Sequence, residues 1–328
     1  MVWSPDILGA GFEQVTLELD GAKPAGAVAT LVRRMPSFTA ALTGALRDVD
    51  VLYVHGWSDY FFQTELARFW TRLGARFHAV DLRGYGRSLR DGQTPGYVAD
   101  LDEYDLDIGA ALVAMGHDPA VRGGRRRKLV LMGHSTGGLT LTLWTSRHPG
   151  VADALVLNSP WLELQVGGLA RQALAPLVQW RAAVDPLGTH PEVDLGFYTR
   201  AQTEIGALPV PEYRAAWRPE RGFPTHPGWL AAIVRGHARI AAGVDVGCPT
   251  LVMLSTRTTT PVQWNEAMTR SDSVLVVDDI AKAATRIGRA VTIVRITDGI
   301  HDLFLSRPEP RADAYAQLER WLRRGALR

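Results

Sequence analysis

The chain has 328 residues, of which 46% are hydrophobic, enough to form one large α/β domain or a core domain with an insertion. Its formal net charge is only +2, so no strong field favours nucleic acid or an anionic membrane as a partner. Its one cysteine, Cys248, excludes an internal disulfide and fits a reducing compartment. The first residues lack the basic and apolar stretches of a signal peptide, and no apolar run is long enough to span a bilayer. We therefore expect a cytoplasmic protein.

Strand-like and helix-like segments alternate along most of the chain. Short runs typical of strands occupy residues 12–19, 27–34, 49–54, 77–81, 129–132, 154–157, 250–254 and 291–296. Plausible helices occupy residues 61–73, 98–115, 138–147, 279–287 and 311–323. This alternation predicts a doubly wound, mostly parallel sheet with helices on both faces.

The alternation stops between residues 160 and 246, where several prolines and four tryptophans occur with helical pieces and no clear strand. We interpret residues 160–246 as a helical cap, or lid, inserted into a core made of residues 1–159 and 247–328. The alternative is a helical excursion that packs against the side of the core.

A serine lies among glycines where a buried strand ends and a helix begins. Gly133-His134-Ser135-Thr136-Gly137 matches the pattern G-x-S-x-G. In a sharp strand-to-helix turn, glycines two residues before and after the serine avoid a steric clash, and the serine hydroxyl stands above the sheet edge. We predict that Ser135 is a nucleophile; the alternative is a glycine-rich loop with an incidental serine.

A serine nucleophile needs a base, and His301 is the candidate. It follows the last apolar strand, and ligands in open parallel sheets gather at the carboxyl ends of strands. The third group should be a carboxylate between serine and histidine in the chain, which orients the imidazole.

The acid does not directly follow the strand at 250–254, because Ser255, Thr256 and Arg257 at that position include no carboxylate. Asp272 is our prediction, with Asp278 or Asp279 as the alternative, since helix N-capping would explain the latter two. Asp302, next to the histidine, is expected to be structural.

The oxyanion of an acyl-transfer intermediate needs N–H donors. We predict the main-chain N–H groups of Thr136, after the nucleophile, and of Trp57, in the turn after the strand at 49–54. We also assign His134 and Trp161 to substrate binding and assign no metal ligands.

The segments "HGWSDY", "VDLRGYGRS", "GHSTGG" and "GIHD" occur in this order, with an insertion after "LNSPW". In these features the chain resembles the α/β-hydrolase superfamily, and most of all the branch of monoacylglycerol lipases, lysophospholipases and related bacterial esterases. The resemblance implies an eight-stranded sheet, a helical cap after the sixth strand, and a Ser–Asp–His triad without a cofactor. It puts the nucleophile at Ser135, the base at His301, and the oxyanion donors at Trp57 and Thr136. By the family's acid-to-histidine spacing, Asp272 fits best.

The leading functional hypothesis is a serine hydrolase that cleaves small carboxylic esters through an acyl-enzyme, with an apolar acyl or aromatic group under the cap. One alternative is a peptidase or amidase of the same fold, which would need cap carboxylates to bind a free amine. The other is a non-catalytic receptor for a small molecule. Candidate cap carboxylates are Glu163, Glu192, Asp194, Glu204, Glu212 and Glu220.

Overall fold

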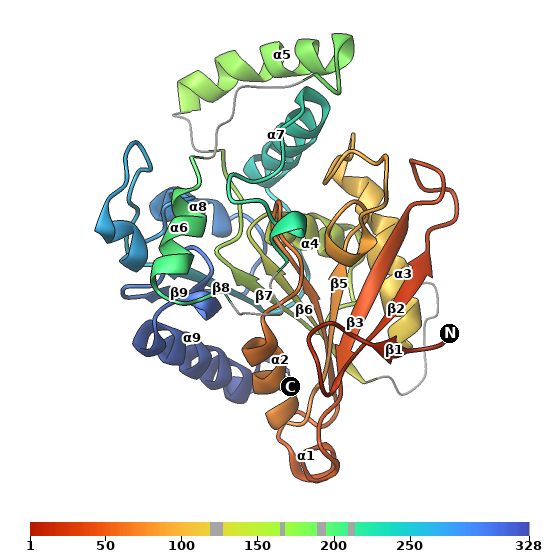
Figure 1. Cartoon of the computed structure of the whole chain (residues 1–328). Coiled ribbons are helices and arrows are strands. Elements are labelled where there is room, and N and C mark those ends of the chain that lie inside the picture. The colour runs from red at the N-terminus through yellow and green to blue at the C-terminus, as the bar shows by residue number, and fades with distance from the viewer. Residues whose placement is uncertain (119–126, 165–167, 189–194, 209–213, 328) are drawn as a thin grey trace.

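A single sheet forms the centre of the molecule (Figure 1). The computed structural model describes residues 1–118, 127–164, 168–188, 195–208 and 214–327. Within these residues, nine strands pair in the order β1-β2-β3-β5-β4-β6-β7-β8-β9. They are β1 (Ser4–Pro5), β2 (Phe12–Glu18), β3 (Val28–Arg34), β4 (Val49–Val54), β5 (Arg76–Asp81), β6 (Lys128–His134), β7 (Ala154–Asn158), β8 (Thr250–Ser255) and β9 (Val291–Ile296).

Six of these strands, β4 to β9, run parallel, and the antiparallel pairs lie at the β1 end of the sheet. The predicted mostly parallel sheet is confirmed, and each predicted strand is present. The expected count of eight is wrong, because β1 adds a ninth strand through Ser4 and Pro5. A two-residue strand has no readable alternation, and proline is tolerated at a sheet edge because its missing N–H faces no partner there.

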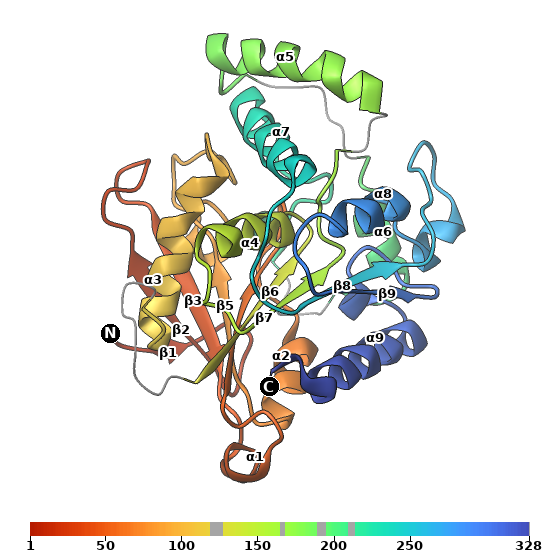
Figure 2. The ribbon, with the colours of Figure 1, turned by 180° about the vertical axis from the view of Figure 1, so that it is seen from behind.

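Helices cover both faces of the sheet (Figures 1 and 2). On one face, a hydrophobic cluster with the sheet includes buried residues of α3 (Asp105–Met115), α4 (Thr136–Arg147) and α8 (Val277–Ala284). The other cluster packs α2 (Thr64–Arg72) and α9 (Pro308–Trp321) on the opposite face. The predicted helices are therefore present, with ends shifted by a few residues. The predicted helix at 98–115 begins as a 3-10 turn, Leu101–Tyr104, before α3.

One short helix, α1 (Phe38–Thr43), was not predicted. None of its residues is buried, so it has no periodic apolar pattern by which a sequence would reveal it. Its N-terminus is capped by Ser37, whose side chain accepts a hydrogen bond from the N–H of Ala40.

The segment between β7 and β8, which we call the inserted segment (residues 160–246), contains helices joined by loops, and no strand among its described residues. It contains α5 (Gly168–Val184), α6 (Phe197–Glu204), a 3-10 turn (Ala215–Trp217) and α7 (Pro227–Ala242). In both views α7 lies between α5 and the sheet, above α4 (Figures 1 and 2). Among the described helices, none is long and apolar enough to cross a membrane.

Candidate active site

Ser135 occupies a strained turn between β6 and α4. Its backbone has φ 51° and ψ −117°, a conformation that a non-glycine residue adopts only when its surroundings enforce it. A Cβ atom on Gly137 would lie 2.3 Å from the carbonyl oxygen of His55, and one on Gly133 would lie 2.7 Å from the carbonyl oxygen of Gly137. Both positions therefore require glycine, because any side chain there would meet backbone atoms at the tight crossing around Ser135.

His301 follows β9, at the sheet edge where β6 also ends. Its Nδ1 atom lies 2.9 Å from Oδ2 of Asp272, and both side chains are buried. The other carboxylate oxygen of Asp272 accepts hydrogen bonds from the N–H groups of Val274, at 2.8 Å, and Leu275, at 2.7 Å. These bonds fix the carboxylate, which in turn fixes the orientation of the imidazole.

The loop after β8 explains how Asp272 reaches this position. The chain leaves the end of the strand and then returns beside it, so that Asp272 forms a parallel bridge with Thr258. The N–H of Asp272 donates to the carbonyl of Arg257 at 3.0 Å, and its own carbonyl accepts from the N–H of Thr259 at 2.9 Å. The acid thus stands beside the strand end in space although it is remote from it in sequence.

The alternative acids are directed elsewhere. Asp278 and Asp279 lie exposed in the first turn of α8, and Asp278 forms an ion pair with Arg295 at 2.7 Å. Their expected N-capping role is wrong, because the N-cap is Val276 and no side chain caps this helix. Acidic residues in a first turn still interact favourably with the helix dipole.

The two predicted oxyanion donors flank Ser135. Thr136 is the first residue of α4, so its N–H has no partner within the helix. Trp57 follows Gly56 in the turn after β4, and a Cβ on Gly56 would lie 3.1 Å from the Cβ of Ser135. The backbone that leads into Trp57 therefore passes directly against the serine.

The two predicted substrate-binding residues also adjoin Ser135. The ring of His134 lies 4.8 Å from that of His301, and its Nδ1–H donates to the carbonyl of Asn158 at 3.1 Å. Burial lowers the pKa of His134 to about 4, so the ring is neutral at neutral pH. Trp161 is half-buried, and its main-chain N–H donates to the carbonyl of Ser135 at 3.0 Å.

Sequence reasoning missed Tyr198 of α6, which lies beside the predicted base His301. Its ring meets that of His301 edge-on, with centroids 5.4 Å apart. Its hydroxyl accepts a hydrogen bond from the N–H of Asp302 at 3.0 Å, and the buried Asp302 carboxylate accepts one from Asn158 at 2.8 Å. The expected structural role of Asp302 agrees with these contacts. A lone tyrosine in an insertion gives no sequence signal of this kind.

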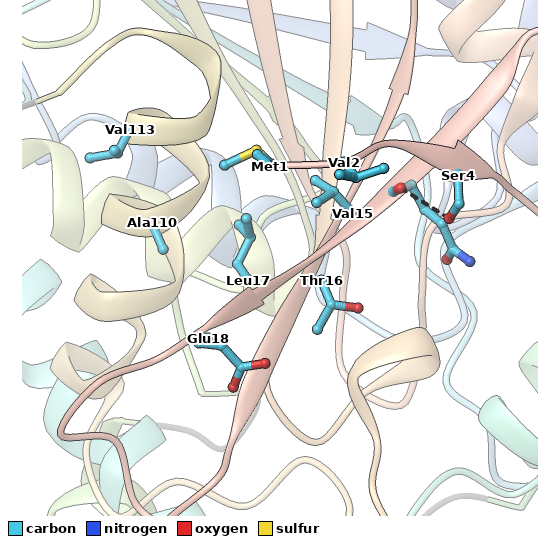
Figure 3. Close-up of a pocket in the computed structure, with 10 residues that line it drawn as sticks. Met1, Val2, Ser4, Val15, Thr16, Leu17, Glu18, Ala110 and Val113 are labelled. Carbon is cyan, nitrogen blue, oxygen red and sulfur yellow. Dashed lines mark hydrogen bonds between the residues drawn. The ribbon is translucent and has the colours of Figure 1, made fainter.

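The site is covered in this structure, since only 8% of Ser135 is exposed and only 2% of His301. A hollow of about 590 Å³ lies elsewhere, between the N-terminal residues, β2 and α3 (Figure 3). None of the predicted site residues lines it.

This sheet, the strained serine turn and the histidine–carboxylate pair define an α/β-hydrolase fold. Residues 47–305 match the model of the Hydrolase_4 family, described as serine aminopeptidase, S33, and the chain belongs to that family.

Curated proteins of two kinds are similar to part of this chain. Lysophospholipase L2 of Escherichia coli (strain K12) is 35% identical over 120 residues, which cover 35% of this chain and 34% of that protein. A non-heme haloperoxidase of Rhodococcus erythropolis is 31% identical over 113 residues, covering 33% of this chain and 36% of the relative. The matched region thus spans about a third of the length of these curated relatives.

Solved structures extend the likeness of fold to the whole chain. A soluble variant of monoglyceride lipase from Saccharomyces cerevisiae has a TM-score of 0.66 at 13% identity, covering 98% of each chain. Monoacylglycerol lipase of Paleococcus ferrophilus has a TM-score of 0.61 at 17% identity, covering 85% of this chain and 95% of the other. These structures therefore share the fold of this chain over most of its length.

Proposed function

We propose that the protein is a serine hydrolase that cleaves carboxylic esters through an acyl-enzyme. The observation that carries this proposal is the 2.9 Å contact between His301 Nδ1 and Asp272 Oδ2, at the same sheet edge as the strained Ser135 turn. The arrangement supplies a nucleophile, a base and an orienting acid in the chain order of this fold.

In the proposed reaction, Ser135 Oγ attacks the ester carbonyl while His301 Nε2 takes its proton. The carbonyl oxygen becomes an oxyanion, which accepts hydrogen bonds from the N–H groups of Trp57 and Thr136. The intermediate collapses, His301 returns the proton to the leaving alcohol, and the acyl group remains on Ser135. Water, activated by His301, then releases the acid. Throughout, Asp272 holds the imidazole and stabilises its charged form.

The surroundings of Trp57 favour an apolar acyl or aromatic group in the substrate. The Trp57 ring lies 3.8 Å, between centroids, from that of Trp229, and 6.1 Å from those of Tyr85 and Phe223. Trp229 and Phe223 belong to the inserted segment, which we propose acts as the cap over the site. The names of the lysophospholipase and monoacylglycerol lipase relatives fit the same substrate class.

The test is hydrolysis of p-nitrophenyl esters of increasing acyl length, with Ser135→Ala as the paired variant and a fluorophosphonate as the covalent probe. Wild type should turn over at least one ester and be labelled at Ser135, whereas Ser135→Ala should do neither while keeping the wild-type circular dichroism. Equal turnover by Ser135→Ala would exclude the proposed nucleophile.

Two other functions are outcomes of the same test. A peptidase or amidase would prefer amino-acid p-nitroanilides to esters. Of the carboxylates that could bind a free amine, Glu204 is exposed and pairs with Arg200, and Glu220 is exposed. Glu163 is partly buried, and Glu192, Asp194 and Glu212 lie outside the described residues. A receptor would neither hydrolyse these substrates nor react with the fluorophosphonate.

A further inference from the structure

The inserted segment contacts four consecutive residues of the turn after β4, which we call the oxyanion loop (residues 57–60). The ring of Trp57 packs against that of Trp229 at a tilt of 35°. Ser58 Oγ accepts a hydrogen bond from the N–H of Phe223 at 3.0 Å. Asp59 and Tyr60 both contact residues within or next to the 3-10 turn Ala215–Trp217.

The oxyanion loop needs such support because its backbone is strained. Ser58 has φ 50°, in the left-handed region that a residue other than glycine enters only under constraint. It directly follows Trp57, whose N–H is the proposed oxyanion donor. A small rearrangement at Ser58 would therefore change the direction of the donor relative to Ser135.

A buried ion pair forms the polar centre of this contact. Arg218 Nε lies 3.2 Å from Oδ1 of Asp59, and each residue is 6% exposed. The other guanidinium nitrogens of Arg218 reach α6: one donates to Gln202 Oε1 at 2.6 Å and one lies 3.5 Å from Thr199 Oγ1. An arginine can make these bonds together because its planar donors point in fixed directions.

The same helix reaches the other two catalytic loops. Tyr198 packs on His301, and the guanidinium of Arg218 lies 5.7 Å from the centre of the Tyr198 ring. On the acid side, Arg200 lies 4.0 Å from the ring centre of Trp264, in the loop that carries Asp272. Arg218 therefore joins the oxyanion loop to the helix that contacts the base and the acid loop.

We propose that Arg218 is a positioning residue that, through Asp59, holds the oxyanion loop in the geometry required for catalysis and so makes turnover depend on docking of the inserted segment. Arg218 touches neither the nucleophile nor the base in the structure. Its effect is exerted on the direction of the Trp57 N–H, which matters most when charge develops on the oxyanion.

The experiment compares Arg218→Met and Arg218→Lys with Arg239→Met, using p-nitrophenyl butyrate at pH 8. Arg239 is the matched control, because it also joins the inserted segment to the core, by a 2.7 Å ion pair with Asp102, but does not contact the oxyanion loop. We expect Arg218→Met to lower kcat about 100-fold with little change in KM, as a misplaced donor would. The kcat of Arg218→Lys should lie between those of wild type and Arg218→Met. The kcat of Arg239→Met should stay within about threefold of wild type.

A double-mutant cycle with Asp59→Asn separates positioning from stability and does not depend on Arg218→Met folding well. If the pair acts as a unit, Arg218→Lys and Asp59→Asn together should lower kcat no further than the more damaging single change. All rates are measured at 25 °C on protein whose folding is checked by its melting transition. Arg218 variants that melt earlier but keep wild-type kcat, or fully additive effects in the cycle, would overturn the proposal.

The proposal rests on the ester hydrolysis proposed above, and fluorophosphonate labelling distinguishes failure of one from failure of the other. A wild-type protein that neither hydrolyses esters nor is labelled overturns the proposed function. A wild-type protein that does both, while the Arg218 variants match it in kcat and labelling rate, overturns only the role of Arg218.

Discussion

The Nδ1 atom of His301 lies 2.9 Å from Oδ2 of Asp272, although residues 256–271 separate Asp272 from the end of β8. The carboxylate reaches the histidine because the loop returns to pair with Thr258 beside the strand. Its second oxygen is held by two backbone N–H groups, so the pair has one fixed geometry.

Replacing Asp272 tests the proposed acid directly. Asp272→Asn should lower kcat by about 10³- to 10⁴-fold, because an amide cannot stabilise the imidazolium and favours the wrong tautomer. The control is Asp278→Asn, whose side chain is 83% exposed and should stay within twofold of wild type. Steady-state hydrolysis of p-nitrophenyl butyrate measures both. Substantial activity in Asp272→Asn would refute the assignment.

Glycine at position 137 has a separate, steric role. In Gly137→Ala the new methyl group would lie 2.3 Å from the carbonyl oxygen of His55, so the Ser135 turn must shift. We expect a loss of about 1–3 kcal/mol in the free energy of unfolding, and a fall in kcat of at least about tenfold. Urea unfolding and ester hydrolysis provide the two measurements.

The matched control for Gly137 is Gly109, in α3, where an added Cβ meets nothing within 4 Å. Gly109→Ala should stabilise the protein by about 0.5–1 kcal/mol, since alanine loses less backbone entropy in a helix. If both alanine variants behaved alike, close packing at Gly137 would not be the reason for the motif glycine.

The sequence predicted the core well because its signals are local. Apolar runs such as residues 49–54 mark strands buried on both faces, and G-x-S-x-G marks a backbone turn that only certain residues permit. The position of Asp272 beside β8, by contrast, depends on a loop that closes through long-range backbone bonds. The contact between Arg218 and Asp59 joins segments that are distant in the chain. Asp59 lies in the segment "HGWSDY", but Arg218 belongs to no motif, so no local pattern pairs the two residues.

The packed rings of Trp57 and Trp229 should contribute to stability as well as to substrate choice. Trp229 is 2% exposed, so Trp229→Ala should lower the free energy of unfolding by about 3–5 kcal/mol. It should also shift the preferred p-nitrophenyl ester towards a longer or bulkier acyl group. Trp180→Ala is the control, because that side chain is 61% exposed on α5 and should change neither property. An unchanged chain-length preference in Trp229→Ala would separate this ring from the substrate.

The ionisation of Asp59 should make stability depend on pH in a direction opposite to that of an ordinary ion-paired carboxylate. Burial raises the pKa of Asp59 to about 7, and the negative charges of Asp302 and Asp81 add to the increase. The positive charge of Arg218 and a hydrogen bond from the backbone of Tyr60 act to lower this pKa but do not outweigh burial. Between pH 4 and 7 the unfolded chain therefore releases this proton while the folded protein keeps it.

The contribution of Asp59 to the free energy of unfolding is therefore greatest below pH 4. It decreases as the pH rises to about 7, by up to about 1.4 kcal/mol per pH unit. Asparagine does not titrate, so the stability of wild type relative to Asp59→Asn should fall between pH 5 and 7 and then level off. Urea unfolding of both proteins at pH 5, 6, 7 and 8 measures the difference, in which most other titrating groups cancel. A difference that grows with pH would instead mean that the attraction of Arg218 outweighs burial at Asp59.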